Sequence, residues 1–162
     1  MKWTIVGGVL AGCALLLAAV GCGAACKCCR TTTDAPAAAP ERVEIDGCEY
    51  TLTANAWRDF QPVAPPNGQP LAVAVWVNVT GSLSSMPQGA FIDRVWVLNG
   101  KEQWSAEPER PSERGLTMSL SAVIRGGPKW GPGIAVDVVV RLKQGKQTWF
   151  VRAAGVPIKR TD

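Results

Sequence analysis

Residues 134–153 read IAVDVVVRLKQGKQTWFVRA, and the pattern of this stretch decides the fold class. Apolar residues recur at every second position on both sides of Gln144-Gly145, which is the period of a β-strand with one buried face. A two-residue turn at Gln144-Gly145 would place Asp137 opposite Arg152. The stretch therefore predicts a β-hairpin with one charged face and one apolar face. The apolar face would carry Ile134, Val136, Val138, Val140, Leu142, Trp149, Val151 and Ala153.

The same two-residue period recurs upstream of this hairpin, from Val43 onward, and no segment shows a convincing helical period. Asp46-Gly47 and Asn99-Gly100 between the periodic segments are typical of tight hairpin turns. Besides the final hairpin, the pattern predicts strands near residues 43–45, 48–58, 71–80, 91–98, 101–105 and 116–124.

Strands that each have one apolar face need a second sheet to cover that face. We therefore expect residues 42–162 to form an immunoglobulin-like β-sandwich of seven or eight mostly antiparallel strands, with a small β-barrel as the alternative. Cys48 shares its strand face with Tyr50 and Leu52, so it is predicted to be a buried free thiol. No other cysteine of the domain could form the inter-sheet disulfide of antibody domains, so the resemblance to them is architectural only.

The N-terminus has the pattern of an export signal, because Lys2 precedes an uncharged run that extends from Trp3 to Cys26. Within it, Ala19-Val20-Gly21-Cys22 resembles the lipobox of bacterial lipoproteins, whose cysteine is lipidated after cleavage. The resemblance implies a signal peptide at residues 1–21 and an acyl chain such as palmitate on Cys22. It also implies a protein held at a membrane of the bacterial cell envelope, outside the cytoplasm.

Two alternatives to this anchor remain open. Leu10-Ala11-Gly12-Cys13 is closer to the lipobox consensus, although it would leave a short hydrophobic segment before the cysteine. The uncharged run is also long enough to cross a bilayer core of about 30 Å as an uncleaved helix.

Residues 22–41 are predicted to be a flexible tether, because TTTDAPAAAPE at residues 31–41 has two prolines and no apolar period. Cys26, Cys28 and Cys29 form a cluster that could bind a soft metal. A tetrahedral zinc site usually needs two separated cysteine pairs, and no second pair follows. We therefore expect oxidised or modified thiols and no metal site.

The composition offers little chemistry for catalysis. The chain has no histidine, which removes Ser-His and Cys-His arrangements, and no phosphate-binding or calcium-binding loop pattern. The net charge of +4 is too small and too scattered to indicate a nucleic-acid partner. We expect no cofactor and no enzymatic activity, with a hydrolase as a distant alternative.

The tryptophans are the candidate binding residues. Trp57 and Trp76 fall on the polar faces of their strands, and Trp130 lies in a loop of glycines and prolines. Exposed aromatic rings stack on sugars or anchor a protein partner, but they also cover the ends of a core. Trp149, by contrast, falls on an apolar face. The sequence thus predicts a non-catalytic binding or scaffolding module for an envelope protein or a glycan. An accessory or inhibitory subunit of an envelope complex is the alternative.

Overall fold

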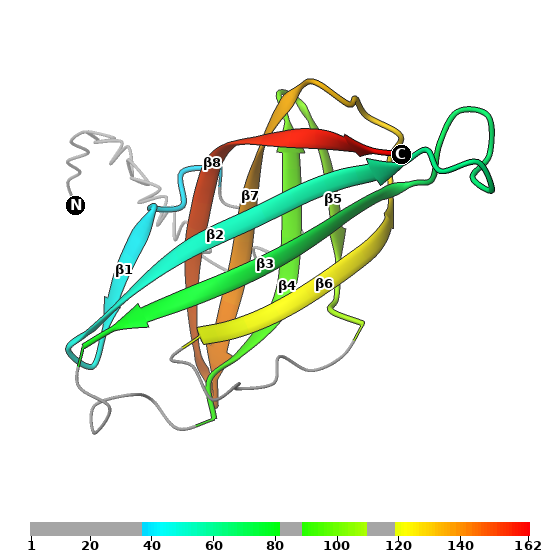
Figure 1. The fold of residues 1–162 in the computed structure, drawn as a ribbon. Coiled ribbons are helices and arrows are strands. Elements are labelled where there is room, and N and C mark those ends of the chain that lie inside the picture. The colour runs from blue at the N-terminus through cyan, green and yellow to red at the C-terminus, as the bar shows by residue number, and fades with distance from the viewer. Residues whose placement is uncertain (1–36, 82–88, 110–118) are drawn as a thin grey trace, which may run out of the picture. The chain divides into compact units, whose positions relative to one another are not determined.

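A computed structural model of the chain describes residues 37–81, 89–109 and 119–162. These residues form eight strands, and the all-β prediction is confirmed (Figure 1). The strands are β1 Arg42–Ile45, β2 Cys48–Asp59, β3 Leu71–Thr80, β4 Phe91–Asn99, β5 Glu102–Ala106, β6 Ser119–Gly127, β7 Ala135–Gln144 and β8 Gln147–Thr161.

The strands form one continuous mixed sheet in the order β5-β4-β7-β8-β2-β3-β6, and β1 pairs with β2 beside this path. The pairings are antiparallel, as expected, except that β2 and β8 run parallel. In Figure 1 the group β2, β3 and β6 crosses in front of the group β4, β5 and β7. The sheet curls into a half-barrel, which differs from the clear two-sheet sandwich that the strand pattern predicts.

Strand β8 joins the two groups because it is long enough to pair with a different strand at each end. Its first part pairs with β7 as far as Pro157, and its last part, from Ile158 to Thr161, pairs with β2. Gly155, with φ +64, lies at the register shift within the β7-paired part, and its N–H donates to the Asp137 carboxylate at 2.9 Å. The sequence pattern ends this strand at Ala153, so the continuation that curls the sheet was missed.

The final hairpin forms, but its turn lies one residue further along than predicted. Gln144 pairs with Gln147, so Gly145 takes the first turn position with φ +56, where type II′ turns have glycine. Val140 consequently faces Val151 and not Trp149. The register changes by two residues, and the apolar and charged faces are therefore preserved.

The main core fills the inside of the half-barrel, and the predicted apolar face of the final hairpin contributes to it. Val136, Val138, Val140, Leu142 and Val151 are buried there, and Trp149 and Ala153 pack against them. Ile134 is the exception, because it is 37% exposed. The inward residues of the other strands complete the core and include Cys48, Tyr50, Ala56, Leu71, Val73, Val75, Val77, Val79, Ile92, Val95, Val97, Leu120, Ala122 and Ile124. Cys48 is buried, as predicted.

A second, smaller apolar cluster lies on the opposite face of β4 and β7. Trp96 and Val139 are fully buried there, and Ala39 covers them. Phe150 packs against the cluster, with its ring centroid 5.9 Å from that of Trp96. Residues 37–41, the described end of the predicted tether, therefore lie on the sheet. We call this segment the strap.

The two edges of the curled sheet approach each other at β5 and β6. The ring of Trp104 on β5 lies so close to Gly127 on β6 that a Cβ at Gly127 would be 2.7 Å from it. The N–H of Glu109 donates to the carbonyl of Val123 at 3.2 Å, and the Glu109 carboxylate pairs with Arg125 at 3.4 Å. These contacts bring the β6 edge to the segment that follows β5.

Candidate functional site

The outer face of β2, β3 and β6 carries both strand tryptophans that the sequence singles out. Trp57 on β2 pairs with Ala72 on β3, and Trp76 on β3 pairs with Thr53 on β2. Residues two or four positions apart on a strand share a face, so both indoles project from the same side of the sheet. Trp76 is 39% exposed and Trp57 is half-buried.

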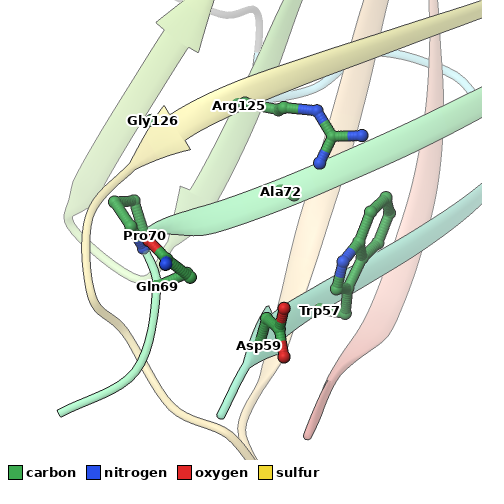
Figure 2. Close-up of a pocket in the computed structure, with 7 residues that line it drawn as sticks. All are labelled: Trp57, Asp59, Gln69, Pro70, Ala72, Arg125 and Gly126. Carbon is green, nitrogen blue, oxygen red and sulfur yellow. The ribbon is translucent and has the colours of Figure 1, made fainter. Parts of the chain in front are cut away.

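A pocket of about 220 Å³ lies at the Trp57 end of this face (Figure 2). Its floor is Ala72, whose small side chain leaves the space open. Figure 2 shows Trp57 on one side of Ala72 and the Gln69-Pro70 pair on the other. Arg125 and Asp59 lie on the remaining two sides. The complete lining is Trp57, Asp59, Gln69, Pro70, Ala72, Arg125 and Gly126.

Local strand geometry positions these side chains. Trp57 and Asp59 are two residues apart on β2 and therefore point to the same face. Between β3 and β6 the register shifts after Leu71, and this irregularity brings Arg125 and Gly126 beside Ala72. Gly126 has φ +83, a conformation that favours glycine over residues with a Cβ.

The pocket is bordered by a positively charged hydrogen-bond donor, Arg125, and by a negatively charged acceptor, Asp59. The Arg125 guanidinium lies 5.7 Å from the centroid of the Trp57 ring, and its Nε faces the Glu109 carboxylate at 3.4 Å. The Asp59 carboxylate accepts a hydrogen bond from the Gln61 N–H at 2.9 Å through one oxygen. The pocket thus combines an aromatic wall, a guanidinium whose local charge is balanced, and a carboxylate held in a defined orientation.

Trp130, the third predicted binding residue, lies apart from this face. It is half-buried and packs against the main core. The buried side chain of Arg58 holds the backbone on either side of it, because its Nη1 donates to the carbonyls of Lys129 at 3.1 Å and Gly131 at 2.6 Å. The structure therefore brings Trp57 and Trp76 to one surface and places Trp130 at the end of the core.

The other two nitrogens of the Arg58 guanidinium donate hydrogen bonds to the loop between β2 and β3. Its Nε donates to the Gln69 carbonyl at 2.9 Å, and its Nη2 donates to the Asn67 carbonyl. Phe60 stacks on the same guanidinium, with 5.0 Å between the guanidinium carbon and the ring centroid. Arg58 thereby links the loop that supplies Gln69 and Pro70 to the loop that contains Trp130.

Sequence reasoning found Trp57 but missed the pocket around it. The signal for Trp57 was the alternation of apolar and polar residues along its strand, which places Trp57 on the polar face. Asp59, Gln69 and Arg125 come from two strands and a loop that only the strand order brings together. No pattern within any one of those segments marks them as neighbours.

Among the described residues, no group of three or more His, Cys, Asp and Glu side chains could hold a metal ion. No helix in this part of the chain is long and apolar enough to cross a membrane. The predicted signal peptide, Cys22 and the cluster of Cys26, Cys28 and Cys29 lie outside the described residues.

Comparison of the chain with protein-family models, with curated proteins and with solved structures finds no significant match.

Proposed function

We propose that the protein is a non-catalytic binding module of the bacterial cell envelope. A lipid on Cys22 holds it at a membrane outside the cytoplasm, and the outer face of β2, β3 and β6 is its ligand-binding surface. The anchor is supported by the lipobox-like Ala19-Val20-Gly21-Cys22, and the surface by the pocket at Trp57.

The pocket supports binding because an aromatic side chain and two charged side chains of opposite sign border one concave space. The side chain of Trp57 points away from the main core, which is filled from the opposite face of β2. Arg125 and Asp59 on an outer face could point freely into water, yet they border one concave space with an aromatic wall. A concave site with an apolar wall and a few converging polar groups is the usual form of a ligand site.

A photo-crosslinking experiment tests this proposal in the cells that make the protein. Gln69 is exposed at the rim of the pocket, and its contacts in the fold are made by its backbone. Replacing Gln69 with p-benzoylphenylalanine in the full chain should give a ligand adduct on irradiation, because the benzophenone inserts into nearby C–H bonds. The adduct should be lost when Trp57→Ala is added.

Lys101 provides the matched control position. It is exposed in the turn between β4 and β5, outside the pocket lining. The same replacement at Lys101 should give no adduct that depends on Trp57. Equal labelling from both positions, or none from Gln69, contradicts the proposed binding surface. A protein in the Gln69 adduct would favour the accessory-subunit alternative for this same surface.

A further inference from the structure

We infer that the pocket at Trp57 binds one ring of a neutral saccharide chain, and that the chain continues along β3 to Trp76. This inference rests on the proposed function, because it names the ligand class of the same surface. The size of the pocket is the first support. A volume of about 220 Å³ exceeds the roughly 150 Å³ cavity that accommodates benzene and is below the range of about 300–1,000 Å³ for drug-sized ligands. The space therefore suits a single six-membered ring.

The chemistry of the walls selects a sugar ring over an apolar one. A pyranose has C–H faces that pack on an aromatic ring and hydroxyls that both donate and accept hydrogen bonds. Trp57 supplies the aromatic wall, Arg125 supplies donors, and Asp59 supplies acceptors. An aromatic or aliphatic side chain of a protein partner would remove water from Arg125 and Asp59 without replacing their hydrogen bonds, which costs free energy.

The charges around the pocket favour a neutral ligand. Glu109 already lies 3.4 Å from Arg125 and balances its charge. Asp59 borders the same space and would repel a phosphate or carboxylate. A ring with hydroxyl groups satisfies both side chains without adding charge.

The surface beyond the pocket favours a chain over a single sugar. Trp76 pairs with Thr53, four residues from Trp57 along β2, so the two tryptophan positions are roughly 13 Å apart along the strand direction. Ala74 on β3 and its partner Asn55 on β2 lie on the outer face between the two indoles, and neighbouring side chains bury Ala72 and Ala74. Thr53 and Asn78, joined by a hydrogen bond of 3.0 Å, add polar groups beside Trp76.

The test uses the full chain, purified in detergent, on an array of neutral linear oligosaccharides of one to six units. The array includes chains of glucose, mannose, galactose, xylose and N-acetylglucosamine. At least one series should bind, with an affinity that rises as the chain becomes long enough to reach both tryptophans. Raising NaCl from 50 to 500 mM should change that affinity less than twofold, because no ligand charge is involved.

Substitutions distinguish the two subsites. Trp57→Ala should weaken binding of short and long members at least tenfold. Trp76→Ala should weaken only the longer members. Phe91→Ala is the matched control, because Phe91 is 38% exposed, like Trp76, but lies on β4 and outside the pocket lining. It should leave affinity unchanged.

Three results overturn the inference: no neutral series binds, binding is insensitive to Trp57→Ala, or binding collapses at high salt. Crosslinking at Gln69 separates these results from a failure of the proposed function. A Trp57-dependent adduct that contains protein, together with a silent array, rejects the saccharide and leaves the binding surface in place. If no adduct forms at Gln69 and no oligosaccharide on the array binds, both the saccharide inference and the proposed binding surface are rejected.

Discussion

Arg58 and Trp130 come from distant parts of the chain, and the guanidinium of Arg58 holds the backbone on both sides of the indole. Its bonds to the carbonyls of Lys129 and Gly131 measure 3.1 and 2.6 Å. No carboxylate pairs with Arg58 among the described residues, so four backbone carbonyls satisfy its charge. This arrangement makes Arg58 a structural link between two loops.

Arg58→Ala should lower the free energy of unfolding by at least about 3 kcal/mol, since it leaves several partly buried carbonyls without a donor. Arg58→Lys should recover little of this loss, because an ammonium cannot reproduce the planar fork of donors. Urea unfolding monitored by tryptophan fluorescence measures both variants. Arg42→Ala is the control and should change stability by about 1 kcal/mol or less, because the Arg42 ion pair with Glu49 is exposed. Equal effects of Arg58→Ala and Arg42→Ala would show that the loop link is unimportant.

Trp130→Ala should also reduce stability, by about 2–3 kcal/mol, because the indole packs against the core. The expected loss is below the roughly 3–5 kcal/mol of a fully buried tryptophan, because Trp130 is half-buried. The reading of Trp130 as an outward contact predicts instead an unchanged melting temperature and weaker ligand binding. Calorimetry of the variant distinguishes the two expectations, and an unchanged melting temperature would restore Trp130 as a binding candidate.

Gly127→Ala should destabilise the closing edge by about 2 kcal/mol, because the new methyl group overlaps the Trp104 ring. A double-mutant cycle identifies the cause. In a Trp104→Ala background the same substitution should cost less than about 0.5 kcal/mol, since the clashing ring is gone. Additive effects would mean that Gly127 is needed for a reason other than its contact with Trp104.

Ala39→Asp should release the strap from the sheet, because it places a charge against the buried Trp96 and Val139. Proteinase K should then cleave within residues 37–41 at least tenfold faster than in the unmodified chain. The neighbouring Ala38 is exposed, so Ala38→Asp adds the same charge without disturbing the cluster. Similar cleavage rates in the two variants would show that the strap is not held by Ala39.

Cys22→Ser should abolish the mass that acyl chains add to the protein and stop maturation before cleavage. Cys13→Ser should change neither, because it lies within the segment that is removed. Mass spectrometry of the membrane fraction checks both variants. A mature protein with an unmodified Cys22, or with residues 1–21 still attached, would rule out the lipoprotein anchor.

Local alternation was sufficient to predict where most of the strands lie and which of their faces form the main core. The final hairpin shows why: moving its turn by one residue shifts the pairing by two, which keeps the side chains on their predicted faces, with exposed Ile134 as the exception. The predicted pair Asp137 and Arg152 even survives as a diagonal ion pair of 3.5 Å. A register error of two residues changes which side chains face each other across the strands, but it does not change which side chains are buried.

The arrangement of the strands was harder to predict because it depends on long-range pairing. Gly155 and Pro157 indicate the end of a strand, yet β8 continues past them and changes partner from β7 to β2. Trp96 is buried on the face opposite the main core because the strap covers it. The sequence of the strap has no apolar period and predicts only a flexible tether. Arg58 is buried because the carbonyls of two loops surround it, and no feature of those loops indicates that they meet.

The parallel contact between β2 and β8 has a consequence for how the chain folds. The hydroxyl of Thr161 donates to the carbonyl of Arg58 across 103 residues of sequence. Pairings between such distant positions carry a large loop-closure entropy and slow the folding of β proteins. The parallel part of the sheet cannot form before residues 158–161 are free to pair with β2. The pairing of β2 with β8 is therefore a late step, and β2 lacks this neighbour until β8 has been made.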